Sequence, residues 1–393
     1  MSLIQKRTCS CLSLFAILFL ILPNSASSQP PPQPRDENLS VRLEVQRAID
    51  RGLSWLEKNQ NADGTWSTGD QAALTALPLL AFKGEPSGRY SKDEPEFIKR
   101  GYSFLEQCAQ PDGSIYKKKE LLTHNTALSV LAFTAAKDEK YNSIIRKGRE
   151  FLIGLQTDFG VKGETDNVFD GGLGYGPKYE HSDMANTLAA LEAIYYSREH
   201  LKDTKAEASK ELDWAAAIEF LQNCQNLPSH NKQDWASDDL ENKGGFVYYP
   251  GHSMAGETNI SGRVTLRSYG SASYAGLLSY IYTDLKRDDP RVQAVYKWLQ
   301  QNYTLEENPG MGPQGLYYYF HTMAKALSAL DVNEIKTADG KEVNWRHDLA
   351  MKLIDLQNAD GSWMNDNGRW WEKDPALVTA YSIIALERIY RGL

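Results

Sequence analysis

Four polar residues stand where acid–base chemistry could take place, at or just before the starts of apolar, alanine-rich segments: Asp70, His181, Asp183 and Asp374. A carboxyl group that acts as a general acid must be kept protonated and made strongly acidic by its neighbours. A carboxylate at the start of a helix also accepts backbone N–H groups and interacts with the helix dipole. We therefore treat all four as candidate catalytic residues, with helix capping as the alternative for Asp70 and Asp374.

Seven other residues are candidates for binding a ligand. The arginines among them could hold an anion through charge-assisted hydrogen bonds, or lie solvated in a loop. A lone histidine is more often a structural group than a ligand contact. Consecutive aromatic residues at 317–320 and 370–371 cannot all face the same way, so some should line a cavity. The seven candidates are His124, Arg263, Arg267, Tyr269, Tyr319, His321 and Trp371.

A repeated segment indicates which elements must position these residues. Residues 51–66 read RGLSWLEKNQNADGTW, the end of an amphipathic helix followed by a tight turn. The segment recurs at 353–363 as LIDLQNADGSW, with a weaker copy at 100–113. Such self-similarity decides the architecture. Aligning the ends of the repeated helices gives six positions: Leu56, Leu105, Leu152, Leu221, Leu299 and Leu353.

A second set of helices lies between these positions. Its members are rich in alanine and leucine and apolar on nearly every side, as a helix buried between layers must be. The repeated helices carry charges on one face and should lie outside. A closed ring of six inner helices wrapped by six outer ones, an all-α (α/α)6 toroid, satisfies both patterns. The inner helices are predicted at residues 72–82, 126–133, 186–195, 273–282, 323–330 and 378–389.

Glycine-rich turns such as 171–175 and 244–250 lead into the inner helices. These turns should therefore meet at one rim of the ring, beside the N-termini of the inner helices. We expect the functional site at that rim.

The N-terminal region has the pattern of a secretory signal peptide. Lys6 and Arg7 precede an apolar run at 12–22, and small residues follow. The alternative is an uncleaved anchor. The predicted organisation is a signal peptide at 1–28, a proline-rich spacer at 29–38 and a toroid domain at 39–393, so the protein is expected to be exported, either periplasmic or secreted.

Charge and cysteine content narrow the function further. The formal net charge is −8 and no basic cluster appears, which argues against nucleic acid as a partner. Cys108 and Cys224 occupy the same register of their repeats. They should therefore lie too far apart for a disulfide, and we expect two free, buried thiols.

The repeated segment resembles the QW motif of the squalene cyclase and protein prenyltransferase superfamily. Its usual form is basic-Gly-x-x-aromatic-Leu-x-x-x-Gln-x-x-x-Gly-x-Trp. The resemblance covers essentially all of the chain after the spacer and also implies an (α/α)6 toroid, in which these residues tie helices together. The matching positions are Arg51, Gly52, Trp55, Leu56, Gln60, Gly64 and Trp66.

The resemblance also locates functional segments. In the cyclases, the middle aspartic acid of Asp-x-Asp-Asp-Thr is the proton donor. Here the segment reads Asp183-Met184-Ala185-Asn186-Thr187, with Ala185 at the donor position. This departure argues against ordinary squalene cyclisation.

The prenyltransferase β-subunit provides a second comparison. By that resemblance, His181 and Arg263 match residues that hold an isoprenoid diphosphate, and Arg267 lies near another. The zinc ligands correspond to Tyr269, Ser271 and His321, of which only the histidine can bind zinc well. The sequence therefore predicts no metal or other cofactor, and the protein is not expected to be a zinc-dependent prenyltransferase.

The leading functional hypothesis is an exported toroid that takes a terpenoid, polyprenyl or similar amphiphilic small-molecule or lipid ligand into its cavity. If the protein is an enzyme, a terpene cyclase or mutase, an isomerase, is the first expectation. One alternative is a non-catalytic binding or scaffold protein, and another is a polysaccharide lyase or hydrolase on the same fold. Contact with a membrane surface is a further expectation.

Overall fold

The computed structural model describes residues 38–92, 94–201 and 211–393. The predicted signal peptide lies outside these residues, as does the spacer up to residue 37. Residues 38–393 form one compact unit. No helix in the described part of the chain is long and apolar enough to cross a membrane.

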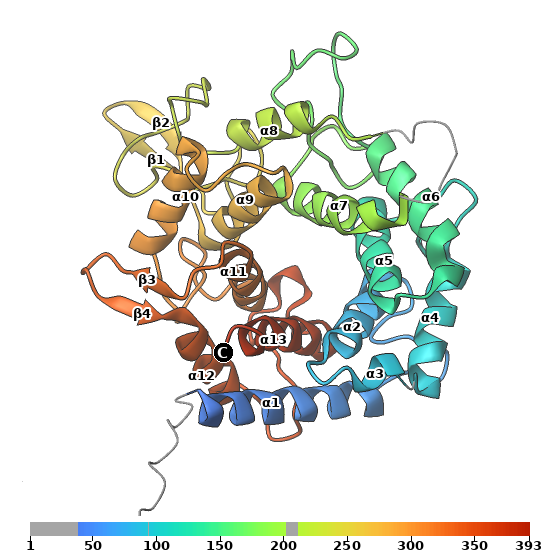
Figure 1. Cartoon of the computed structure of the whole chain (residues 1–393). Helices are drawn as coiled ribbons and strands as arrows, with labels where there is room; N and C mark the ends of the chain where they lie inside the picture. Colours follow the sequence, from blue (N-terminus) through green and yellow to red (C-terminus); the bar gives the residue numbers. More distant parts are fainter. Residues whose placement is uncertain (1–37, 93, 202–210) are drawn as a thin grey trace, which may run out of the picture. The chain divides into compact units, whose positions relative to one another are not determined.

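Six helices form a closed inner ring (Figure 1). Each helix packs against the next, and the last packs against the first. Nearly all of their side chains are buried, because neighbours lie on both sides and outer helices lie behind. The inner helices are α2 (Ala73–Gly84), α5 (Leu122–Ala136), α7 (Met184–Tyr196), α9 (Gly270–Tyr282), α11 (Leu316–Ala329) and α13 (Pro375–Tyr390). This confirms the predicted inner helices, although α5 and α11 begin several residues earlier than expected.

Six outer helices wrap the ring (Figure 1). Each buries an apolar face against the inner helices. All six leucines that mark the ends of the repeated helices are buried. The outer helices are α1 (Leu39–Lys58), α4 (Glu96–Cys108), α6 (Asn142–Gly154), α8 (Trp214–Asn223), α10 (Pro290–Gln301) and α12 (Trp345–Asp355). The chain is therefore an all-α (α/α)6 toroid, as predicted.

Short elements fill the connections. Two antiparallel hairpins pair β1 (Glu257–Ile260) with β2 (Arg263–Leu266), and β3 (Glu334–Lys336) with β4 (Glu342–Asn344). The sequence did not predict these strands, because each is only three or four residues long. The remaining elements are α3 (Arg89–Lys92), η1 (Glu139–Tyr141), η2 (Ser197–Leu201) and η3 (Arg369–Trp371).

The glutamine of the repeated segment ties neighbouring outer helices together. Gln60 Nε2 donates to Phe97 O of α4 at 2.8 Å. In the last repeat, Gln357 Nε2 donates to Ala48 O of α1 at 3.0 Å, which joins the last unit to the first. At the same seam, Asn38 Nδ2 donates to Leu393 O at 3.4 Å. The expected structural role of this glutamine is therefore seen directly.

The glycine of the repeated segment allows two backbones to approach closely. Gly64 has φ +88°, and a Cβ built on it would lie 2.5 Å from Arg100 O of α4. Gly361 has φ +99°, and its Cβ would lie 2.6 Å from Arg51 O of α1. Only glycine fits this positive φ and this spacing without strain.

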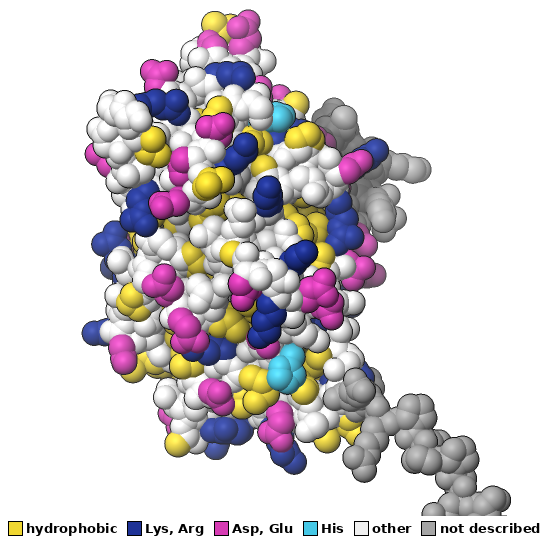
Figure 2. Space-filling model, turned by 90° about the vertical axis from the view of Figure 1, so that its left-hand side faces the viewer, with side chains coloured by type: hydrophobic (Ala, Val, Ile, Leu, Met, Phe, Trp, Pro, Cys, Tyr) yellow, Lys and Arg dark blue, Asp and Glu magenta, His cyan; other side chains and the backbone are white. Residues whose placement is uncertain are grey.

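Cys108 and Cys224 are free and buried, as predicted. Burial raises the pKa of the Cys108 thiol to about 11. On the side of the molecule shown in Figure 2, Lys and Arg side chains are scattered among Asp and Glu. This face therefore has no large basic patch.

Candidate functional site

A cavity of about 340 Å³ lies at the N-terminal ends of the inner helices. All six helices contribute to it through their first two turns, for example through Leu74 of α2, Asn186 of α7 and Tyr381 of α13. The rim expected from the glycine-rich turns therefore does contain a cavity. Connecting loops complete its wall with Tyr175, Tyr248, Met254, Asn308, Met311, Trp370 and Trp371.

The wall of the cavity is mostly apolar and aromatic. Leucine and methionine side chains alternate with five tyrosines and two tryptophans. Its other polar side chains are neutral amides, one serine and one histidine. Among the described residues, no Asp, Glu, Lys or Arg lines it. The neutral polar residues are Gln71, His124, Asn125, Asn186, Ser271 and Asn308.

Side chains accept first-turn N–H groups at most of the helix N-termini around the cavity, two from the helix's own N-cap residue and three from other parts of the ring. Asp183 caps α7, and Asp374 caps α13. The buried carboxylate of Glu372 accepts the Tyr318 N–H of α11 at 2.8 Å. Asn125 accepts the Ala73 N–H of α2, and Asn308 accepts the Ser271 N–H of α9, both at 2.9 Å. The first-turn N–H groups that could otherwise bind a ligand are thus largely occupied.

Asp183 is fully buried beneath the cavity lining at the start of α7. Its carboxylate accepts the backbone N–H groups of Ala185 and Asn186, and the Asn186 Nδ2 at 2.8 Å. Burial raises the pKa of Asp183 to about 6, against these hydrogen bonds, which lower it. The side chain is therefore mostly ionised at neutral pH and acts as a helix cap.

This raised pKa predicts an unusual pH dependence. The Asp183 carboxyl binds its proton more tightly in the folded chain than in the unfolded chain, where its pKa is near 3.8. Its contribution to the free energy of unfolding should therefore fall, by up to roughly 3 kcal/mol, as the pH rises from about 4 to about 6. Asp183→Asn keeps a capping oxygen but does not titrate. Denaturant unfolding of both proteins across this pH range tests the prediction, and a wild-type advantage that grew with pH would contradict it.

Three of the predicted site residues line the cavity: His124, Tyr269 and Trp371. His124 has no hydrogen-bond partner among the described residues, and burial lowers its pKa to about 4, so it is neutral at pH 7. Trp371 is half exposed at the mouth and has φ +66°, next to Trp370 with φ +58°. Two consecutive non-glycine residues with positive φ have a strained backbone.

Two of the acid candidates have other surroundings. Asp70 lies three residues before α2 rather than at its start, and its half-exposed carboxylate pairs with Lys118 at 2.9 Å. It caps no helix, contrary to the expected alternative. Asp374 does cap α13, through the N–H groups of Ala376 and Leu377. Neither residue lines the cavity.

His181, Tyr319 and His321 also lie outside the lining. The His181 ring stacks on Tyr249, with 4.3 Å between ring centroids. The Tyr319 hydroxyl donates to Thr304 O at 2.9 Å within the core. His321 lies in the second turn of α11, buried against the Tyr381 ring. Burial lowers its pKa well below the usual value. The three predicted histidines therefore do not share one site.

Arg263 and Arg267, which we expected beside a ligand head group at the rim, do not line the cavity. Arg263 belongs to β2, and Arg267 follows it directly. This hairpin lies outside the inner ring (Figure 1). Both side chains are exposed, and Arg263 donates to the Ala236 carbonyl. The sequence analysis did not predict this hairpin, and the hairpin is what holds both arginines away from the cavity.

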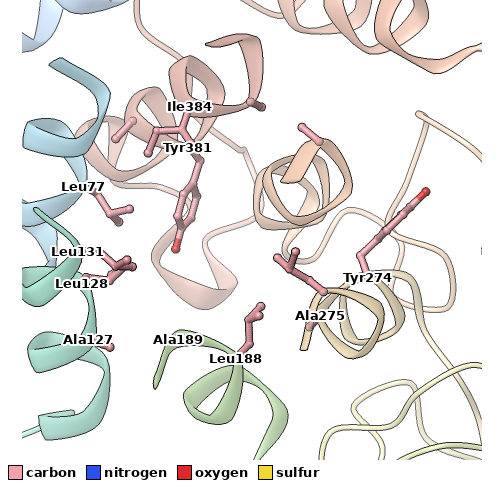
Figure 3. Close-up of a cluster of buried hydrophobic side chains, with 14 of the residues drawn as sticks. Leu77, Ala127, Leu128, Leu131, Leu188, Ala189, Tyr274, Ala275, Tyr381 and Ile384 are labelled. Carbon is pink, nitrogen blue, oxygen red and sulfur yellow. The ribbon is translucent and has the colours of Figure 1, made fainter. Parts of the chain in front are cut away.

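Some residues of the site had not been predicted. Tyr381 projects from α13 towards the centre of the ring, among Leu77, Leu188 and Ala275 (Figure 3). Its hydroxyl has no hydrogen-bond partner among the described residues. Tyr381 lies within an otherwise apolar segment, and its place in the second turn of an inner helix is the one signal that could have found it. The described residues contain no group of three His, Cys, Asp or Glu arranged to hold a metal ion.

Solved structures with the same architecture include enzymes of two kinds. A variant of the type II terpene cyclase MstE from Scytonema, in complex with geranylgeranyl dihydroxybenzoate, superposes with a TM-score of 0.54 and 11% identity, over 90% of this chain and 99% of that one. An inactive variant of a GH76 α-1,6-mannanase from Salegentibacter, in complex with α-1,6-mannotriose, superposes with a TM-score of 0.54 and 10% identity, over 89% of this chain and 100% of that one. This chain shares their (α/α)6 toroid fold.

A GH76 α-mannanase from Bacteroides thetaiotaomicron has a TM-score of 0.54 and 10% identity, over 89% of this chain and 99% of that one. No protein-family model matches the chain. At such identities the likeness extends to the fold, and the function must be argued from the cavity itself.

Proposed function

We propose that this protein binds an apolar or amphiphilic small molecule of the isoprenoid type inside the ring. One observation carries the proposal: the cavity of about 340 Å³ with a mostly apolar and aromatic wall built by all six inner helices. Ligand pockets of roughly 300–1,000 Å³ with such walls typically hold one small molecule. The terpene cyclase of the same fold is in complex with a geranylgeranyl compound, which supports an isoprenoid ligand here.

The chemistry around the cavity favours binding over the two catalytic alternatives. A cyclase or mutase that protonates an alkene needs an acid facing its substrate, and a glycosidase typically needs a pair of carboxyl groups. Among the described residues, no carboxyl group lines the cavity. The nearby Asp183 lies outside the lining, and its carboxylate is occupied by two backbone N–H groups and the Asn186 amide. We therefore propose binding without these reactions.

Filling the cavity tests the proposal. Ala185 lines it, whereas Ala215 is exposed on α8, so Ala185→Trp and Ala215→Trp make the same change inside and outside the site. Native mass spectrometry of each protein with farnesol should detect a one-to-one complex for the wild type and for Ala215→Trp. The Ala185→Trp variant should lose most of it.

Equal farnesol binding by both variants would show that the ligand does not enter the cavity. Binding of α-1,6-mannotriose in place of farnesol, lost in Ala185→Trp, would replace the isoprenoid proposal with a glycan one.

We also propose, from residues 1–28, that the mature protein is exported and works in the periplasm or outside the cell, where it could contact a membrane surface. The intact mass of the protein isolated from its source tests cleavage. A mass that retains these residues would reject the signal peptide.

A further inference from the structure

The cavity combines an apolar wall with an absence of cationic side chains. Its polar side chains are neutral, and no Lys or Arg of the described residues lines it. An anionic ligand would lose its hydration on entering such a cavity without gaining a positive partner. This is the opposite of what a diphosphate or carboxylate needs.

The helix N-termini do not supply the missing positive charge. Helix N-termini often bind anions through free N–H groups and the helix dipole. Around this cavity, the carboxylates of Asp183, Glu372 and Asp374 already accept first-turn N–H groups of α7, α11 and α13. These three negative charges offset the dipoles at the positions where a ligand anion would bind.

The field of one of these carboxylates reaches the cavity wall. Asp183 directly precedes the lining residues Met184, Ala185 and Asn186. Burial first, and the negative charge of Asp183 second, raise the pKa of the lining residues Tyr175 and Tyr248. A negative head group would therefore be repelled from this side of the cavity.

Neutral hydrogen-bonding groups without partners remain available. The hydroxyl of Tyr381 points towards the centre of the ring (Figure 3). It has no hydrogen bond to any described residue, and the same is true of the His124 ring. One polar, uncharged group on a ligand could satisfy such atoms, whose isolation costs stability.

We propose that the cavity selects an uncharged amphiphile, an isoprenoid-like hydrocarbon that carries a hydroxyl group, over the corresponding diphosphate or carboxylate. The hydroxyl hydrogen-bonds to Tyr381, and the hydrocarbon packs against the leucines, methionines and aromatic rings. This inference rests on the proposed isoprenoid-binding function and adds the charge and type of the head group.

Three probes with one fifteen-carbon skeleton test the head group: farnesol, farnesyl diphosphate and the hydrocarbon farnesene. Equilibrium binding to the full-length mature protein should be at least about tenfold tighter for farnesol than for the diphosphate. If the diphosphate binds as tightly as farnesol, the present inference is overturned and the binding function stands. If none of the three binds, the binding function itself is overturned.

Two matched pairs of variants locate the effect. Tyr381→Phe should weaken farnesol binding about threefold to tenfold and leave farnesene binding unchanged, because one hydrogen bond is lost. Tyr319→Phe removes a hydroxyl that bonds to Thr304 outside the cavity, and should change neither. Equal effects of these two variants on farnesol would overturn the assignment to Tyr381.

The second pair compares two capping carboxylates. Neither side chain lines the cavity, but Asp183 directly precedes three lining residues and its charge acts on Tyr175 and Tyr248, whereas Asp374 lies three residues before the lining residue Leu377. Asp183→Asn should reduce the ratio of the affinity for farnesol to the affinity for farnesyl diphosphate about fivefold or more, and Asp374→Asn should reduce this ratio less. An unchanged affinity ratio in Asp183→Asn would show that the charge of Asp183 does not repel the diphosphate.

Discussion

Gly64→Ala should destabilise the protein by about 3–5 kcal/mol, against about 1–2 kcal/mol for Gly251→Ala. The two glycines have nearly the same φ, +88° and +89°, so the backbone strain of the added methyl group is similar. They differ in their surroundings. The Cβ at Gly64 would lie 2.5 Å from Arg100 O of α4, whereas nothing lies within 4 Å of the Cβ at Gly251.

Denaturant unfolding of the two variants and the wild type measures the difference. The excess loss in Gly64→Ala reports the contact between the turn and the next outer helix, separated from the cost of a positive φ. Equal losses would mean that the turn moves away from α4 without consequence, and that the repeated glycine does not hold neighbouring units together.

Lys325→Met should cost about 3–5 kcal/mol of stability, because it leaves a buried carboxylate without its partner. Lys325 Nζ of α11 lies 2.5 Å from Glu192 Oε2 of α7, and both side chains are at least nine-tenths buried. The other carboxylate oxygen of Glu192 accepts the Tyr282 hydroxyl at 3.1 Å. One hydroxyl group stabilises a buried carboxylate far less than an ammonium group does.

The double variant Glu192→Leu/Lys325→Met is the control, because a buried pair replaced by apolar side chains of similar volume is often no less stable. We expect it to recover most of the loss seen in Lys325→Met. A thermal or denaturant scan of wild type, both single variants and the double variant completes the cycle. A double variant as unstable as Lys325→Met would show that packing volume matters here rather than an unpaired charge.

The architecture was predictable from the sequence because it repeats. Each unit carries an amphipathic helix, a turn and an apolar helix, and the period alone implies alternating outer and inner positions. The structural role of Gln60 and Gly64 also followed from their recurrence at Gln357 and Gly361. The rim was predictable as well, since turns between outer and inner helices must all lie at one end.

The contents of the site were less predictable, because they depend on contacts between units. Glu372 caps α11 although it lies far beyond that helix in the sequence, just before α13, and no local pattern indicates this. Arg263 and Arg267 lie in a connection whose hairpin turns them away from the cavity. Tyr381 was overlooked because a tyrosine in an apolar helix is ordinarily part of the core. In a ring, the innermost side of such a helix faces a cavity.

The seam between the last unit and the first has a consequence for the order of the chain. Asn38 and Leu393 are joined by a hydrogen bond, and α1 packs against α13. The six units therefore form a closed ring in space, although the backbone passes through them in a linear order. The chain could equally be opened at any other connection between two units. Circular permutation of the compact unit 38–393, with Leu393 joined to Asn38 and the chain opened in another surface loop, would preserve every interface between units.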